Sequence, residues 1–149
     1  MWSIVGGETA ARLMLAAVLA APQAVLQELV PATLAQGTQS NIGQPRQVVV
    51  RTVEEWRVLW AAHSLQPAPP VDFLRSVVVG VFLGSRPTAG FRVEITGATA
   101  QDGQAVVRFV EHRPAPDAIL AQIITTPFHL VVLPASLRAI TLQQSESPR

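Results

Sequence analysis

The chain has 149 residues, of which 49% are hydrophobic and 14% are charged, and its formal net charge is +1. This composition supplies enough apolar side chains for one folded domain and excludes an intrinsically disordered chain. All basic residues are arginines, scattered and never adjacent to one another, which argues against a nucleic-acid-binding surface. Because cysteine is absent, disulfides, thiolate nucleophiles, thiolate metal sites and a lipidated cysteine anchor are excluded.

Residues 1–35 are predicted to form a signal peptide or an N-terminal anchor. Arg12 precedes the short apolar run of residues 13–21, as a positive charge precedes the apolar core of a secretory signal. We therefore expect an exported protein, located in the periplasm, in the cell envelope or in the medium. Cleavage is compatible with three small residues, and the polar residues that come next favour the last of them: Ala20, Ala24 and Ala35.

Two other interpretations of this segment stay open. Gln23, Gln27 and Glu28 interrupt the apolar residues, which argues against a stable transmembrane helix of about 20 apolar residues. The segment can instead form an amphipathic helix of the mature domain. It can also remain as an uncleaved anchor, which would be the only contact with a membrane that the sequence predicts.

A folded domain is predicted after a linker. The linker is the polar, glycine-containing stretch at residues 36–45, the β-rich domain covers residues 46–142, and a disordered polar tail covers residues 143–149. Residues 47–51 are short, apolar in the middle and bounded by polar residues, so they are predicted to form the first strand.

An amphipathic helix follows this strand. Thr52 and Glu55 have the spacing of a capping box, in which each side chain satisfies a free backbone N–H of the first turn. One face of the helix is predicted to carry Val53, Trp56, Trp60 and His63, with Leu59 at its flank. The two tryptophans are expected to pack the helix onto a sheet, because helical spacing does not suit a pair that stacks on carbohydrate.

Residues 77–83 are apolar without interruption and predict a central strand covered on both faces. The loop at residues 84–91 then breaks the strand, because Gly84 and Gly90 permit positive φ and Pro87 donates no hydrogen bond. We expect Arg86 to point from this stiff loop into solvent. The loop is either an ordinary connection or a surface that presents Arg86 and Thr88 to a partner; it lacks both common phosphate-loop motifs.

The second half of the domain is predicted to consist of strands. Alternation at residues 91–96 and a return strand at 105–112 flank the Asp102-Gly103 hairpin signal. Within this hairpin, outward-facing Arg108 and Glu94 are expected to pair. After a loop or short helical turn at residues 117–124, Pro127 opens a strand that Pro134 closes, and residues 138–142 form the last strand.

No catalytic or metal-binding motif stands out. There is no G-x-S-x-G motif, and the histidines at 63, 112 and 129 have no metal-ligand spacing. His129, Ser136 and Asp72 can be combined into a triad on paper, but most chains of this size offer such a trio. Neither a metal nor a cofactor is expected.

The predicted fold is α+β, with a mostly antiparallel sheet and the two-Trp helix packed on it. A β-sandwich with an inserted helix is the alternative.

Several segments resemble one known family in order. They are the two-Trp helix at residues 55–60, the stretch at 70–73, the strand and loop at 79–93, and the Thr-Thr-Pro-Phe strand start at 125–131. Over roughly residues 52–142 the chain resembles the C-terminal domain of PrcB-like proteins, a bacterial exported family named for an accessory lipoprotein of a protease complex. Where the family motif has Gly-Gly-Tyr, this chain has Ala89-Gly90-Phe91, and the anchoring cysteine is missing.

The resemblance implies a non-catalytic role, and it supplies no catalytic residues. The first hypothesis is therefore an exported, non-enzymatic module that binds another exported protein and assists or stabilises a protease. Its predicted contact residues are Arg86, Thr88, Gly90, Phe91 and Phe128, and its predicted structural residues are Thr52, Glu55, Trp56, Trp60, Gly84 and Pro127.

The second hypothesis is a small-ligand-binding or hydrolytic domain. Its site would be a pocket between helix and sheet, near His129 and Asp72.

Overall fold

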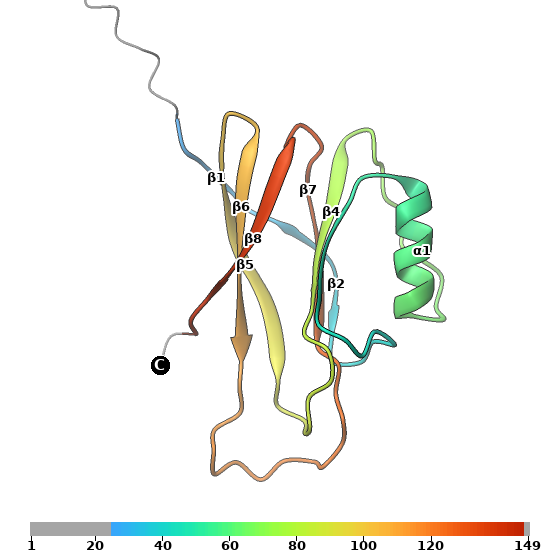
Figure 1. The fold of residues 1–149 in the computed structure, drawn as a ribbon, viewed down its shortest axis with the longest axis vertical. Coiled ribbons are helices and arrows are strands. Elements are labelled where there is room, and N and C mark those ends of the chain that lie inside the picture. The colour runs from blue at the N-terminus through green and yellow to red at the C-terminus, as the bar shows by residue number, and fades with distance from the viewer. Residues whose placement is uncertain (1–24, 148–149) are drawn as a thin grey trace, which may run out of the picture.

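The computed structural model describes residues 25–147 and folds them into eight strands and one helix (Figure 1). In chain order the elements are β1 (Gln27–Leu29), β2 (Ala32–Gly37), β3 (Arg46–Val50), α1 (Val53–His63), β4 (Ser76–Phe82), β5 (Arg92–Gln101), β6 (Gln104–His112), β7 (Phe128–Pro134) and β8 (Ala139–Ser145).

The strands form two four-stranded sheets, in the orders β1-β5-β6-β8 and β2-β7-β4-β3. All neighbouring strands are antiparallel except β6 and β8, which are parallel. The sheets pack face to face, and α1 lies on the outer face of the second sheet (Figure 1). The predicted α+β fold is confirmed, and its sheets are arranged as in the alternative, a β-sandwich with an inserted helix.

Strand β4 is the centre of this arrangement, because both of its faces are buried. Val77, Val79 and Val81 point into the core between the sheets, whereas Val78 and Phe82 point into the core under α1. Gly80 also faces α1, where a Cβ atom would overlap the side chain of Leu130. The uninterrupted apolar run therefore predicted the position of β4 correctly.

Helix α1 is capped at Thr52, whose hydroxyl accepts a hydrogen bond from the backbone N–H of Glu55. The hydroxyl also donates to the Glu55 carboxylate, so the glutamate bonds the side chain of Thr52 rather than its backbone N–H. Trp56, Leu59, Trp60 and His63 are buried against the sheet, and Val53 is 40% exposed.

The two indoles also hold the proline-rich connector that follows α1. The Nε1–H of Trp56 donates to the carbonyl of Pro69 at 3.1 Å, and that of Trp60 donates to the carbonyl of Gln66 at 2.7 Å. Each tryptophan thus packs its ring on the sheet and uses its polar atom to fix the connector.

The hairpin between β5 and β6 is the one that the sequence predicts. Asp102 and Gly103 have φ of 52° and 77°, and Gln101 pairs with Gln104 across the two-residue turn. The predicted pair of Arg108 and Glu94 is wrong, however. The register set by the two-residue turn places Arg108 opposite Gly97, and a bulge between Ile95 and Gly97 then places Glu94 opposite Val110.

The partners of the two charged residues differ accordingly. Arg108 reaches Glu28 at 3.4 Å, and Glu94 lies 2.9 Å from the ring of His112.

The sheets extend beyond the predicted domain boundaries. Strands β1 and β2 lie in the segment predicted to be a leader and the start of a linker, and β8 runs to Ser145 in the predicted tail. Leu29 packs against the core between the sheets, and Leu34 packs against the core under α1. Residues 1–24, which hold most of the predicted signal, lie outside the described residues. No helix in residues 25–147 is long and apolar enough to cross a membrane.

Candidate functional site

Two loops lie together at one end of the sandwich, at the bottom of Figure 1. We call them the paired loops: residues 84–91, after β4, and residues 113–127, between β6 and β7. Arg86 and Thr125 exchange two backbone hydrogen bonds, of 2.7 and 3.0 Å. The N–H of Ala89 donates to the carbonyl of Ala121 at 3.1 Å, and the Thr125 hydroxyl donates to the carbonyl of Thr88 at 2.9 Å.

Two glycines allow the first loop to pack closely, Gly90 against the second loop and Gly84 against Pro45, just before β3. Gly84 and Gly90 have φ of 76° and 95°, a conformation that other residues seldom adopt. A Cβ atom on Gly84 would lie 2.7 Å from the nitrogen of Pro45, and one on Gly90 would lie 2.8 Å from the Cβ of Pro114. Both positions therefore require glycine.

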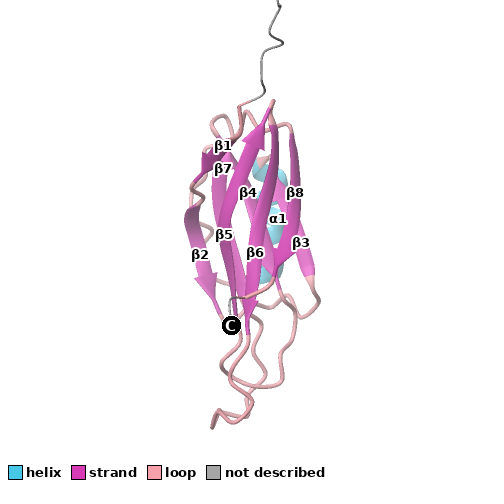
Figure 2. Ribbon diagram, turned by 90° about the vertical axis from the view of Figure 1, so that its left-hand side faces the viewer, coloured by secondary structure: helices cyan, strands magenta, loops and turns pink. Residues whose placement is uncertain are grey.

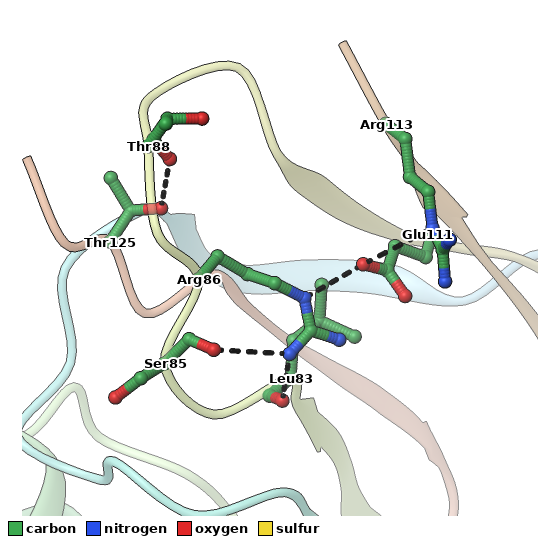
Figure 3. Close-up of polar contacts among 7 residues, drawn as sticks. All are labelled: Leu83, Ser85, Arg86, Thr88, Glu111, Arg113 and Thr125. Atoms are coloured by element: carbon green, nitrogen blue, oxygen red, sulfur yellow. Dashed lines mark hydrogen bonds and ion pairs between the residues drawn. The ribbon is translucent and has the colours of Figure 1, made fainter. Parts of the chain in front are cut away.

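Arg86 does not point into solvent as predicted, but turns back under the paired loops (Figure 3). Its Nε donates to Glu111 at 2.8 Å, and its Nη1 donates to the carbonyls of Leu83 and Ser85 at 3.0 and 3.2 Å. The side chain of Glu111 is only 6% exposed, because it continues the inward-facing row of β6. A buried carboxylate requires a cation, and Arg86 supplies the nearer of two, since the Nε of the exposed Arg113 lies 3.8 Å from the same oxygen.

The other predicted contact residues differ in how far they are exposed to solvent. Thr88 is half-buried and donates from its hydroxyl to the carbonyl of Ala89 at 2.9 Å. Gly90 is exposed and Phe91 is half-buried. Phe128 is 7% exposed, and its ring centroid lies 4.3 Å from that of His63. Phe128 is thus a core residue, because it lies on the face of β7 that meets α1.

The sequence analysis missed three exposed isoleucines in the second of the paired loops. Ile119, Ile123 and Ile124 are 102%, 54% and 69% exposed. Leu120, between them in sequence, is half-buried and faces Gly90. The signal was present in the sequence, since four large aliphatic residues occur within six positions of a segment predicted as a loop or short helical turn.

His129 lies on the opposite face of β7 from α1. The backbone N–H of Ile95 donates to its Nδ1 at 2.8 Å, so the neutral ring carries its proton on Nε2 and donates to the Thr33 hydroxyl at 2.9 Å. Asp72 is exposed and pairs with Arg75 at 3.8 Å, and Ser136 is also exposed. The structure therefore does not assemble the trio of His129, Ser136 and Asp72.

The groove between helix and sheet is not lined by His129 or Asp72, the residues near which the second hypothesis places its pocket. A groove of about 540 Å3 runs between α1 and β3, and its charged lining residues are Arg46, Glu54 and Glu55. No histidine lines it. Within the described residues, no three or more potential metal ligands come together.

Residues 77–134 match the family model described as PrcB C-terminal. This segment runs from β4 to β7, so it contains both of the paired loops and the Arg86–Glu111 ion pair. No curated protein and no solved structure matches the chain.

We predict that Arg86→Ala lowers the free energy of unfolding by about 3 kcal/mol, because the buried Glu111 would keep only the exposed Arg113, at 3.8 Å, as a cationic partner. Denaturant unfolding measures this change. Arg75→Ala is the matched control, since it removes an arginine from an exposed pair and should cost less than about 1 kcal/mol. The double variant Arg86→Ala/Glu111→Ala should recover part of the loss. Equal losses in Arg86→Ala and Arg75→Ala would contradict this account.

We also predict that stability falls on mild acidification. Burial lowers the pKa of His63 and of His129 below the ordinary value of 6.5, although the charge of Glu94 partly opposes the shift of His129. The unfolded chain therefore binds more protons, and the free energy of unfolding should decrease as the pH falls below about 6.5.

Unfolding curves between about pH 8 and about pH 5 test this expectation. His129→Gln is the informative variant, because a glutamine amide can still accept from Ile95 and donate to Thr33. It should show a shallower pH dependence than the original chain. A pH dependence that is absent or of opposite sign would show that the histidines are not held neutral by the fold.

Proposed function

We propose that this PrcB-like chain is an exported, non-enzymatic protein that binds another protein through its paired loops, as an accessory of a protease complex. The family match over residues 77–134 supports the accessory role, because the family takes its name from such a component. The binding surface is inferred from the loops themselves.

The observation that carries the proposal is the exposure of Ile119, Ile123 and Ile124 on a loop that is held in place. Exposed aliphatic side chains lose unfavourable contact with water when a partner covers them. Three of them on one of the paired loops supply the kind of apolar side chains that lie at the centre of protein interfaces.

The loop is also pre-organised for binding. Its backbone is bonded to residues 86 and 89, and Arg86 is fixed in turn by Glu111. A loop that is already ordered loses less conformational entropy when a partner binds than a free loop does. The ion pair thus contributes to binding indirectly, by holding the loop that carries the isoleucines.

We predict that Ile119→Asp and Ile123→Asp each weaken partner binding by at least about tenfold, because a carboxylate would replace a buried apolar contact. A tagged chain can first recover the partner from the envelope and culture fluid of the native host. Binding of the purified partner is then measured by titration.

The matched controls are Leu65→Asp and Leu74→Asp, which introduce the same charge at leucines that are each 93% exposed and lie outside the paired loops. They should bind like the original chain. If they weaken binding as much as the isoleucine variants, the paired loops are not the binding surface. A recovered protease, or a protein that forms a complex with one, is the partner that the proposal expects.

Export is a separate part of the proposal and rests on the signal-like segment around residues 13–21. Cleavage after Ala35 would remove β1 and most of β2, including Thr33, which bonds His129. We therefore expect processing after Ala20 or Ala24, and an intact-mass measurement on the chain recovered from its host tests this. A mass that corresponds to cleavage after Ala35 would contradict the expectation.

A further inference from the structure

Strand β3 forms one edge of its sheet, and its outer side lacks a strand in the described part of the chain. The sheet order is β2-β7-β4-β3, and β3 pairs with β4 without interruption from Arg46 opposite Phe82 to Val50 opposite Val78. Within residues 25–147, no backbone hydrogen bond reaches β3 from outside this ladder. Its outward N–H and C=O groups therefore offer a template for a further strand.

Of the three other edge strands, β8 has seven residues and no bulge, whereas β1 and β2 are protected in ways that β3 is not. Strand β1 has only three residues, and β2 is interrupted by a bulge between Thr33 and Ala35. Short edges and bulges are common means of preventing unwanted pairing. Strand β3 has no bulge, and its last three residues are valines. Figure 2 shows β3 at one side of the sandwich, where the edge strand β8 of the other sheet also lies.

A groove of about 540 Å3 accompanies β3 along its whole length, on the side of α1. Its lining includes all five residues of β3 and, from the helix, Val58, which is 70% exposed. An added strand would thus find hydrogen-bonding groups on the edge of β3 and space for its side chains in the groove.

The charges of the groove differ between its two ends. Arg46 begins β3, whereas Glu54 and Glu55 lie in the first turn of α1, shortly after Val50 ends β3. Four residues of extended strand separate Arg46 from Val50 by about 13 Å. The groove therefore has a basic end and an acidic end.

We propose that this edge binds a second copy of the chain, with the two β3 strands antiparallel about a twofold axis at Val48. In this arrangement, Arg46 of each copy lies opposite Val50 of the other copy, at the acidic end of its groove. Val48 meets Val48 at the centre, and the two four-stranded sheets become one of eight strands. The same surface serves on both copies, as twofold symmetry requires.

The self-complementary charges favour a second copy over an unrelated strand. A strand from another protein would need a basic residue about 13 Å from an acidic one, in the correct direction, to match the groove equally well. A second copy of the chain meets this requirement at both ends of the interface, because Arg46 of each copy lies near Glu54 and Glu55 of the other. This inference is independent of the proposed function, because β3 lies outside both the paired loops and the family match.

Charge reversal with the full chain tests the proposal. The monomer has a mass of 16.0 kDa, and light scattering or sedimentation over a concentration series should show twice this mass. Arg46→Glu and Glu54→Arg should each raise the dissociation constant of the dimer by at least about tenfold, because like charges would meet at both ends. Glu54 is chosen over Glu55 because Glu55 bonds the cap residue Thr52.

Mixing the two variants in equal amounts should restore a dimer, since the carboxylate introduced at position 46 of one copy would then meet the guanidinium introduced at position 54 of the other. This rescue also shows that both variants are folded.

Arg75→Glu is the control and should dimerise like the original chain. The proposal is overturned by a monomer at every concentration, by a dimer that persists in both reversed variants, or by a mixture that stays monomeric. Ile119→Asp should leave the dimer intact, so loss of partner binding and loss of dimerisation can be distinguished.

Discussion

The burial of β4 on both faces is the constraint on which the rest of the structure depends. Alternate residues of this one strand belong to two cores, one between the sheets and one under α1. The helix, the first sheet and the proline-rich connector are each positioned by packing against β4 or against a residue that packs on it. The loop after β4 therefore starts from a strand that packing on both faces holds rigid.

The Arg86–Glu111 ion pair extends this rigidity to the paired loops. Glu111 continues the inward row of β6 at the end of the sandwich, and Arg86 closes that end from the loop. An arginine that looks like a contact residue in the sequence thus has a structural role, and we propose the exposed isoleucines of the neighbouring loop as the surface for a partner. If a partner binds there, binding and fold stability are coupled, because the ion pair that stabilises the fold also holds the loop that carries the isoleucines.

Elements that depend on residues close together in the sequence were predicted correctly. The run at 77–83, the Asp102-Gly103 turn and the cap at Thr52 each lie where the sequence placed them. Features that depend on distant partners were not predictable in this way. Arg86 turns inward because of a carboxylate 25 residues away, and β1 and β2 gain their pairing from strands that follow much later. The predicted pair of Arg108 and Glu94 does not form because the register of the turn places Arg108 opposite Gly97, three residues from Glu94.

Hydrogen exchange on the chain, alone and in complex with the partner recovered from its host, tests the central claim most directly. The account predicts that added protection is concentrated in the paired loops, above all at residues 117–124, while α1 and the connector at residues 64–70 exchange as before. Protection confined to α1 and β3, with unchanged exchange in the paired loops, would contradict it. The partner would then bind the face on which the two-Trp helix lies.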